Sequence, residues 1–186
     1  MPRFCRSARA VSIAALLLFA LSRGAGAQNV PETATPTPVD ADRAAVAAIV
    51  MESVSDVKRC GLATEKSNDP EVRLLCRKGS AESARTAIAG MQLAQTLGGP
   101  AAKLQPSPQT SAELDTLAQY SGQDFDREFL LAEIRDRSGE ELDVRYAVEV
   151  ANDKSVKSYE DGVLPKLADQ LERAEGALRR ISEASP

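Results

Sequence analysis

The side chains that could do chemistry in this sequence are carboxylates and cysteines, because the chain contains no histidine. Without histidine there is no imidazole general base, no Ser–His or Cys–His pair, and no Glu-x-x-His metal site of the kind found in helical bundles. Glycine-rich phosphate-binding motifs and the G-x-S-x-G motif are also missing from the sequence. We therefore predict no catalytic residue, no cofactor and no enzymatic activity.

Cys60 and Cys76 are the sharpest local signal. They stand eight residues before and eight residues after Asn68, so a helical hairpin that turns at Asn68 would place them at the same height on facing helices. In an oxidising compartment such a pair can form a disulfide, which would contribute about 3 kcal/mol of stability. The alternative is a pair of small thiols packed in an apolar core. The spacing and the expected compartment favour the disulfide.

Four carboxylates lie at similar distances from their predicted hairpin turns: Glu52, Glu82, Asp136 and Asp169. Four carboxylates at one level of a helical bundle could hold a hard cation. However, Glu52 falls opposite the apolar stripe of its own helix, which indicates a solvent-facing side chain. We therefore predict no metal site, and we expect these acids to be solvated.

Arg137 and Glu141 stand at positions i and i+4 on a face that is otherwise apolar. They are the candidate interaction site, as a partly buried ion pair that faces a cavity or a partner. The favoured alternative is a pair at the rim, with packed stems and charges that reach water, because long charged side chains are seldom fully buried.

An internal duplication predicts the elements that position these residues. Residues 40–73 align without gaps on residues 124–157. The identities kept in both copies include Asp42 and Asp126, Asn68 and Asn152, and Asp69 and Asp153. Each copy predicts a helix, a tight turn and the start of a second helix. Because one hairpin cannot bury its apolar faces alone, two hairpins predict an all-α, four-helix bundle.

The helix boundaries follow from capping residues and from proline and glycine. In the first hairpin we expect a helix from Asp40 or Asp42 to the turn at 67–70, followed by a helix to about Leu97. A long crossover over 98–123 should contain a short helix at Ser111–Tyr120. In the second hairpin we expect a helix from Asp124 or Asp126 to about Ala151, followed by a helix from Asp153. Pro165 lies inside the last helix and is expected to kink it.

The N-terminus predicts export. A basic stretch and a short apolar run precede a small-residue cleavage site, Ala25-Gly26-Ala27. Residues 1–27 therefore form a predicted signal peptide, residues 28–39 a flexible leader rich in Pro and Thr, and residues 40–186 the bundle domain. The apolar run is too short for a membrane span, so we predict a periplasmic or secreted protein with no span after cleavage.

The charge of the chain excludes one class of partner. The net charge is −4, and removal of the predicted signal peptide, which contains four arginines and no acid, makes it −8. An acidic chain without a basic tract offers no electrostatic surface for nucleic acid. A protein or an envelope component is the expected partner.

Three segments resemble the exported helical family known as domain of unknown function 4142. DTLAQYSGQDFDREFLLAEIRDR resembles its L-x-x-L-S-G-x-x-F-D-x-x-[YF]-[LV] motif, VLPKLADQLERA resembles its L-P-x-L-x-x-H-L-x-x-A motif, and EKSNDPEVRLLCRKGSAESA fits its first hairpin. The resemblance implies a ferritin-like bundle and brings no assigned activity. It carries over architectural residues, with Asp126 as a helix cap and Pro165 as a fixed kink; the others are Gly122, Phe125, Phe129, Leu164 and Leu167.

The family pattern has three histidines that this chain replaces, with Ser83, Arg137 and Gln170 at the matching positions. A metal or acid–base role is therefore not carried over. The sequence favours an exported, non-enzymatic helical bundle that acts by binding or as an envelope-associated stress or structural component. The alternatives are a divergent ferritin-like metal or redox module that uses carboxylates, and a paralogue that kept the fold and lost its site.

Overall fold

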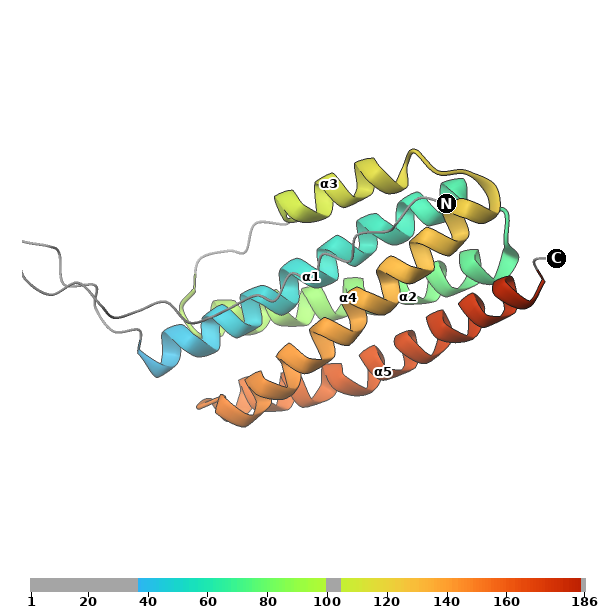
Figure 1. Cartoon of the computed structure of the whole chain (residues 1–186). Helices are drawn as coiled ribbons and strands as arrows, with labels where there is room; N and C mark the ends of the chain where they lie inside the picture. The colour runs from blue at the N-terminus through green and yellow to red at the C-terminus, as the bar shows by residue number, and fades with distance from the viewer. Residues whose placement is uncertain (1–36, 100–104, 185–186) are drawn as a thin grey trace, which may run out of the picture. The chain divides into compact units, whose positions relative to one another are not determined.

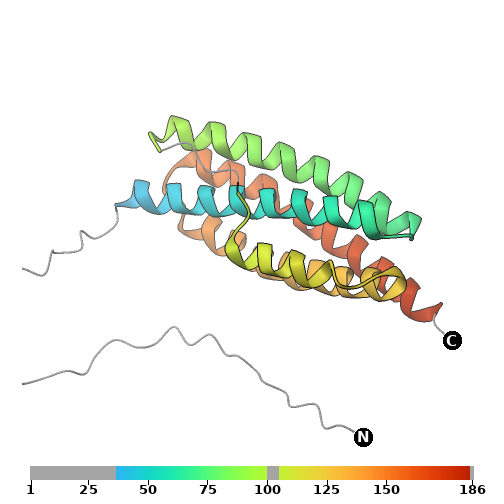
Figure 2. The same cartoon turned by 90° about the horizontal axis from the view of Figure 1, so that it is seen from above.

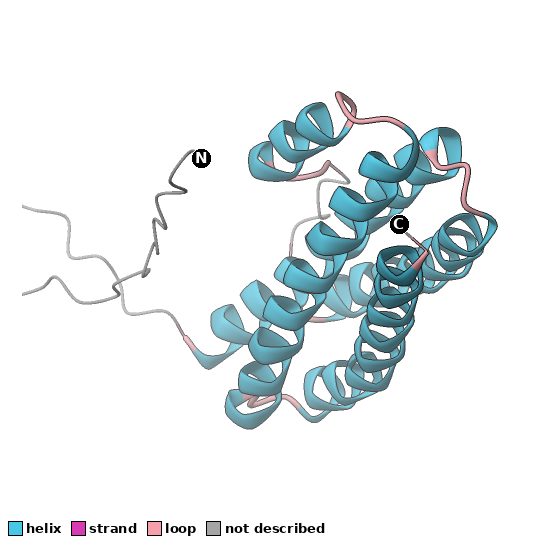
Figure 3. Cartoon of the chain, turned by 45° about the vertical axis from the view of Figure 1, so that its right-hand side comes forward, coloured by secondary structure: helices cyan, strands magenta, loops and turns pink. Residues whose placement is uncertain are grey.

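The computed structural model describes residues 37–99 and 105–184 of the chain, and all regular secondary structure in these two ranges is α-helical (Figure 1, Figure 3). The predicted signal peptide and residues 28–36 of the predicted leader lie outside the described residues. No helix in the described ranges combines the length and the apolar character that a membrane span requires. The predicted all-α class is confirmed.

Four long helices and one short helix make up the domain: α1 (Pro38–Lys66), α2 (Pro70–Thr96), α3 (Pro108–Leu117), α4 (Gly122–Val150) and α5 (Lys154–Glu183). The helices α1 and α2 form one antiparallel hairpin, and α4 and α5 form the other. The hairpins meet through α2 with α5 and through α1 with α4. The short α3 lies against both α1 and α4 (Figure 2).

Local capping residues determine where the helices start, and the start of α1 differs from the prediction. Asp69 caps α2 and Asp153 caps α5, each accepting two backbone N–H groups of the first turn. In contrast, α1 begins at Pro38 rather than at Asp40 or Asp42, because Thr37 and Asp40 form a reciprocal capping box. The end of the predicted leader therefore belongs to the helical domain.

The duplicated aspartates inside α1 and α4 do not cap their own helices, which corrects the role predicted for Asp126. The carboxylate of Asp42 instead accepts the backbone N–H groups of Asn152 at 3.1 Å and Asp153 at 2.8 Å, in the turn of the other hairpin. Asp126 in turn interacts with Ser67 and with the backbone of Asp69. Each hairpin thus uses the same repeated residue to hold the turn of its partner hairpin.

The core is built from small and medium side chains around two phenylalanines. Phe125 and Phe129 are fully buried, and their rings stack with centroids 6.0 Å apart. Pro165 lies within α5, which continues through it to Glu183. Two further apolar clusters fill the other end of the domain; they contain Val46, Val50, Ala94 and Val156, and Ile49, Val144, Val163 and Leu167.

Gly90 lies where α2 packs closely against α1 and α5, and its replacement by alanine is expected to destabilise the domain. A Cβ atom there would lie 2.5 Å from the hydroxyl oxygen of Tyr159 and 2.6 Å from Cγ2 of Val50. Tyr159 also donates its hydroxyl to the carbonyl of Thr86 at 3.1 Å, which restrains the ring. We expect Gly90→Ala to lower the free energy of unfolding by about 1–3 kcal/mol in urea titrations.

Gly61 supplies the matched control for this prediction. It is exposed in α1, and no atom lies within 4 Å of a Cβ built at this position. Gly61→Ala is expected to stabilise the helix by about 0.5–1 kcal/mol. Equal effects of the two substitutions would show that helix propensity, rather than close packing, governs Gly90.

Candidate functional site

Arg59 is the centre of a buried network of charges. It lies on α1 with only 1% of its surface exposed. Its guanidinium contacts four carboxylates, at 3.0 Å from Asp56, 3.3 Å from Glu113, 3.2 Å from Glu133 and 2.7 Å from Asp136. These acids come from α1, α3 and α4, so a single arginine joins three helices.

Arg137 on α4 is the second buried arginine, with 2% exposure. Its guanidinium contacts three carboxylates, those of Asp56, Glu133 and Glu140. Glu141 pairs instead with Arg145 at the surface. Both parts of the sequence interpretation are therefore wrong: Arg137 does not pair with Glu141, and it is not a rim residue. The reason is that Glu140, one residue earlier, lies on the inward side of α4 beside Asp56.

The acids of this network are only partly neutralised. Asp56, Glu133 and Glu140 share Arg59 and Arg137, and all three acids lie away from bulk water. Burial raises the pKa of Glu140 to about 8, against the opposing charge of Arg137 and with the help of the nearby acids. Burial also raises the pKa of Asp56. Asp56 and Glu140 therefore bind protons more tightly than ordinary carboxylates do.

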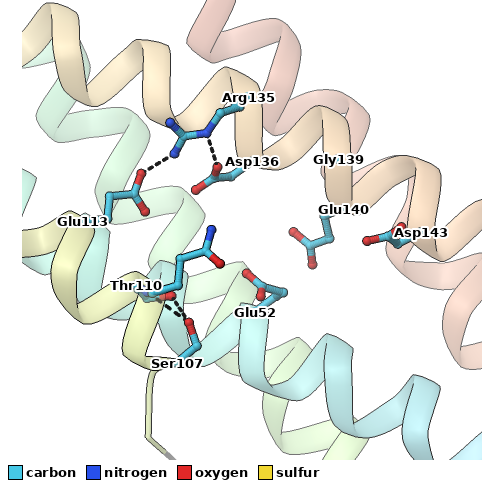
Figure 4. Close-up of a pocket in the computed structure, with 10 residues that line it drawn as sticks. Glu52, Ser107, Thr110, Glu113, Arg135, Asp136, Gly139, Glu140 and Asp143 are labelled. Carbon is cyan, nitrogen blue, oxygen red and sulfur yellow. Dashed lines mark hydrogen bonds and ion pairs between the residues drawn. The ribbon is translucent and has the colours of Figure 1, made fainter. Parts of the chain in front are cut away.

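A cleft of about 330 Å³ lies beside the network, between α1, α3 and α4 (Figure 4). Its charged lining consists of Glu52, Glu113, Arg135, Asp136, Glu140 and Asp143. The helix α3 forms one wall, and it is fixed to α1 by the hydroxyl of Thr110, which lies 3.2 Å from that of Ser55. The sequence predicted α3 only as a short crossover helix.

The carboxylates of the cleft fall into two groups. Glu113 and Asp136 hold the exposed Arg135, at 2.5 and 2.8 Å. Glu52, in contrast, makes no hydrogen bond or ion pair with any described residue, and its carboxylate points toward that of Glu140 (Figure 4). Burial and the charge of Asp56 raise the pKa of Glu52. One half of the cleft is thus occupied by an arginine, and the other half is acidic and open.

The four acids that the sequence placed at one level do not meet. Glu52 is half-buried in the cleft rather than solvent-facing, and only Asp136 joins it there. Glu82 accepts a hydrogen bond from the amide of Gln170 at 3.1 Å, and Asp169 pairs with Arg173 on the surface. In the described part of the chain, no three acidic or thiol side chains are arranged to hold one metal ion.

Cys60 and Cys76 lie together in the core, as their spacing predicts, but they are free thiols in this structure. Both are at least 97% buried. A hydrogen bond with Cys76 and then burial raise the pKa of the Cys60 thiol. The arrangement is the alternative considered for the pair, two small thiols in an apolar cluster with Phe125 and Phe129.

The three positions that depart from the family histidines converge in the structure. Ser83, Arg137 and Gln170 line one small internal cavity together with Asp56 and Glu140. The hydroxyl of Ser83 donates to Asp56 at 3.2 Å. The replaced positions therefore lie at or beside the buried charge network.

No curated protein matches the chain. A family model described as "Domain of unknown function (DUF4142)" matches residues 27–177. This range contains the four long helices except the end of α5, and with it the entire charge network and the cleft. The chain therefore belongs to the DUF4142 family.

Proposed function

We propose that this protein is an exported, non-catalytic binding module with a ferritin-like four-helix bundle, and that its cleft between α1, α3 and α4 binds an organic cation. The cation is a guanidinium or ammonium group on a small molecule or on a partner's side chain. The observation that carries this proposal is the open acidic half of the cleft, where Glu52 and Glu140 face each other without a cation between them.

The charge balance around the cleft supports a cationic ligand. The carboxylates that line the cleft or contact the adjacent arginines are Glu52, Asp56, Glu113, Glu133, Asp136, Glu140 and Asp143, and the arginines are Arg59, Arg135 and Arg137. Seven acids and three arginines leave more carboxylates than cations in a partly desolvated place. A cation bound there would gain more Coulomb energy than one at an exposed site.

The occupied half of the cleft indicates which kind of cation fits. Arg135 lies between Glu113 and Asp136 with contacts of 2.5 and 2.8 Å, as a planar guanidinium between two carboxylates. The acids of the open half do not form a metal-binding group among the described residues, and the cleft volume of about 330 Å³ lies within the range of small-molecule sites. These features favour an organic cation over a bare metal ion.

Calorimetric titration with agmatine, which carries both a guanidinium and an amine, tests the proposal. We expect saturable binding at low salt that weakens as salt screens the charges. Glu52→Gln/Glu140→Gln is expected to weaken binding at least tenfold, because it removes the unpaired carboxylate of Glu52 and the carboxylate of Glu140 that faces it. Glu172→Gln, an exposed acid on α5, is the control and should leave the affinity unchanged. Absent binding, or equal binding by all three chains, would refute the proposal.

The pH dependence of binding gives a second arm of the same experiment. The free protein holds a proton on Glu140 up to a pKa of about 8, whereas a bound cation favours the ionised form. The affinity should therefore rise as the pH increases through 8, with proton release on binding below that value. Glu140→Gln should remove this rise in affinity. An affinity that stays constant between pH 6 and 9 in the unmodified chain would contradict the role of Glu140.

A further inference from the structure

Glu160 is a buried acid that the proposed cleft does not use. It is 0% exposed, and neither of its carboxylate oxygens has a hydrogen-bond partner among the described residues. It lies on α5 between Val156 and Val163, which belong to apolar clusters that also contain Ala94 of α2 and Val144 of α4. An ionised carboxylate without donors in such surroundings is strongly disfavoured.

The charged groups around Glu160 increase this penalty. From α1 the facing charge is the carboxylate of Asp42, and from α5 it is that of Asp161. Arg43, the cation next to Asp42, is directed instead to the carbonyl of Leu97. The neighbouring hydroxyl of Tyr159 is donated to α2, at the carbonyl of Thr86, and α2 and α4 place apolar side chains in the flanking clusters. Neither a cation nor a donor therefore faces this carboxyl group within the described ranges.

Glu160 lies near the residue that holds the α4–α5 turn against α1, so its charge can affect that contact. Asp42, which acts on Glu160, is the residue that accepts the backbone N–H groups of Asn152 and Asp153 and so holds the α4–α5 turn to α1. A negative charge on Glu160 repels Asp42 and favours the entry of water to solvate it. Both effects weaken the hydrogen bonds between Asp42 and the α4–α5 turn.

We propose that Glu160 is a proton-binding site that latches this end of the domain: it carries a proton while Asp42 holds the α4–α5 turn, and loss of the proton loosens that turn. The ligand of the site is the proton itself, and its binding strengthens the contact between α1 and the α4–α5 turn. The site is separate from the acidic cleft, so either proposal can fail without the other.

The direction and size of the effect follow from linkage. Burial, then Asp42 and Asp161, raise the pKa of Glu160 from 4.5 to about 7. Because the folded pKa is the higher one, stability is greatest below pH 4.5 and declines as the pH rises to 7, after which this group adds no further change. Between pH 5.5 and 8.5 this residue alone should raise the unfolding equilibrium constant by about 30-fold.

Urea unfolding of the whole chain at pH 5.5 and 8.5 tests the latch, with Glu160→Gln compared with the unmodified chain. Other buried acids also titrate, so the readout is the difference between the chains. We expect the rise in the unfolding constant over this range to be about 30-fold smaller in Glu160→Gln, and unchanged in the exposed-acid control Glu172→Gln. An identical rise in Glu160→Gln and the unmodified chain would overturn the proposal.

A second measurement does not depend on any variant. The side-chain carboxyl carbon of Glu160 can be followed by NMR in the unmodified chain while the pH is raised. We expect a midpoint near 7, with the amide signals of Asn152 and Asp153 moving, and their exchange protection falling, over the same range. A midpoint near 4.5, or amides of the turn that do not respond, would show that Glu160 is not a latch.

Discussion

Arg59→Met is expected to lower the free energy of unfolding by about 3–5 kcal/mol at pH 8, as measured by urea denaturation. Methionine fills much of the volume of the arginine stem but removes one of the two cations that each of Asp56, Glu133 and Asp136 contacts. Asp56 and Glu133 then keep only Arg137, and Asp136 keeps only the exposed Arg135. The loss of a partner leaves an excess of buried negative charge, which costs far more than the ion pair itself contributes. The loss of stability should be smaller at pH 5, because the acids that lack Arg59 can then take up protons.

Arg135→Met is the matched control for this prediction. Arg135 contacts Glu113 and Asp136, two of the acids that Arg59 also contacts, but its side chain is 66% exposed. Exposed ion pairs contribute about 1 kcal/mol or less, so this variant should be nearly as stable as the unmodified chain. Similar losses in the two variants would mean that position in the network, rather than burial, sets the cost.

Asp42→Ala has the second large effect that we expect, a loss of about 3 kcal/mol in the same assay. Two backbone N–H groups, at Asn152 and Asp153, lose a charged acceptor, and hydrogen bonds to charged groups contribute about 1.5–3 kcal/mol each. Relief of the repulsion with Glu160 offsets part of this loss. The loss should therefore be larger at pH 5.5, where Glu160 is protonated, than at pH 8.5.

The repeat itself provides a comparison for this substitution. Asp126 occupies the equivalent position in the second hairpin, but one of its oxygens has no partner among the described residues, and burial raises its pKa overall. Asp126→Ala should therefore cost less than Asp42→Ala. Glu65→Ala, at an exposed site on α1, should change stability by no more than about 0.5 kcal/mol. A loss from Asp42→Ala as small as that would contradict the tie between the hairpins.

The sequence predicted the hairpins because their signals are local. The caps Asp69 and Asp153 act on N–H groups two and three residues away, and the apolar stripes repeat within single helices. The α1 start was missed although its signal was local too, since the Thr37–Asp40 capping box lies inside a segment rich in Pro and Thr. Such a composition is typical of a flexible leader, so it does not indicate a helix start.

The charge network could not be predicted in the same way, since its members meet across helices. Asp56 and Arg59 flank the predicted apolar stripe of α1, and an acid and an arginine three residues apart there are a local signal of a buried ion pair. No pattern within one helix shows that Glu133 and Arg137 of α4 approach the same point. The same limit explains why Arg137 was assigned to Glu141, its neighbour along the helix.

The sequence predicts where the two cysteines lie, but it does not predict their oxidation state. Their spacing around Asn68 correctly predicted that Cys60 and Cys76 would meet between α1 and α2. Whether the two thiols are oxidised depends on the redox conditions that the chain encounters, which the spacing of residues does not encode. The disulfide therefore remains a prediction for the exported protein, in addition to the thiol pair that the structure contains.

The measurement that tests the central proposal most directly is an NMR titration of the whole chain with agmatine, read at each backbone amide. We expect saturable shifts at Gly139, Glu140 and Asp143 of α4 and at Glu52 of α1, which line the acidic cleft, and little change along the far face of α5. Shifts spread evenly over surface acids, or no saturable shifts in the cleft, would contradict a built cation site.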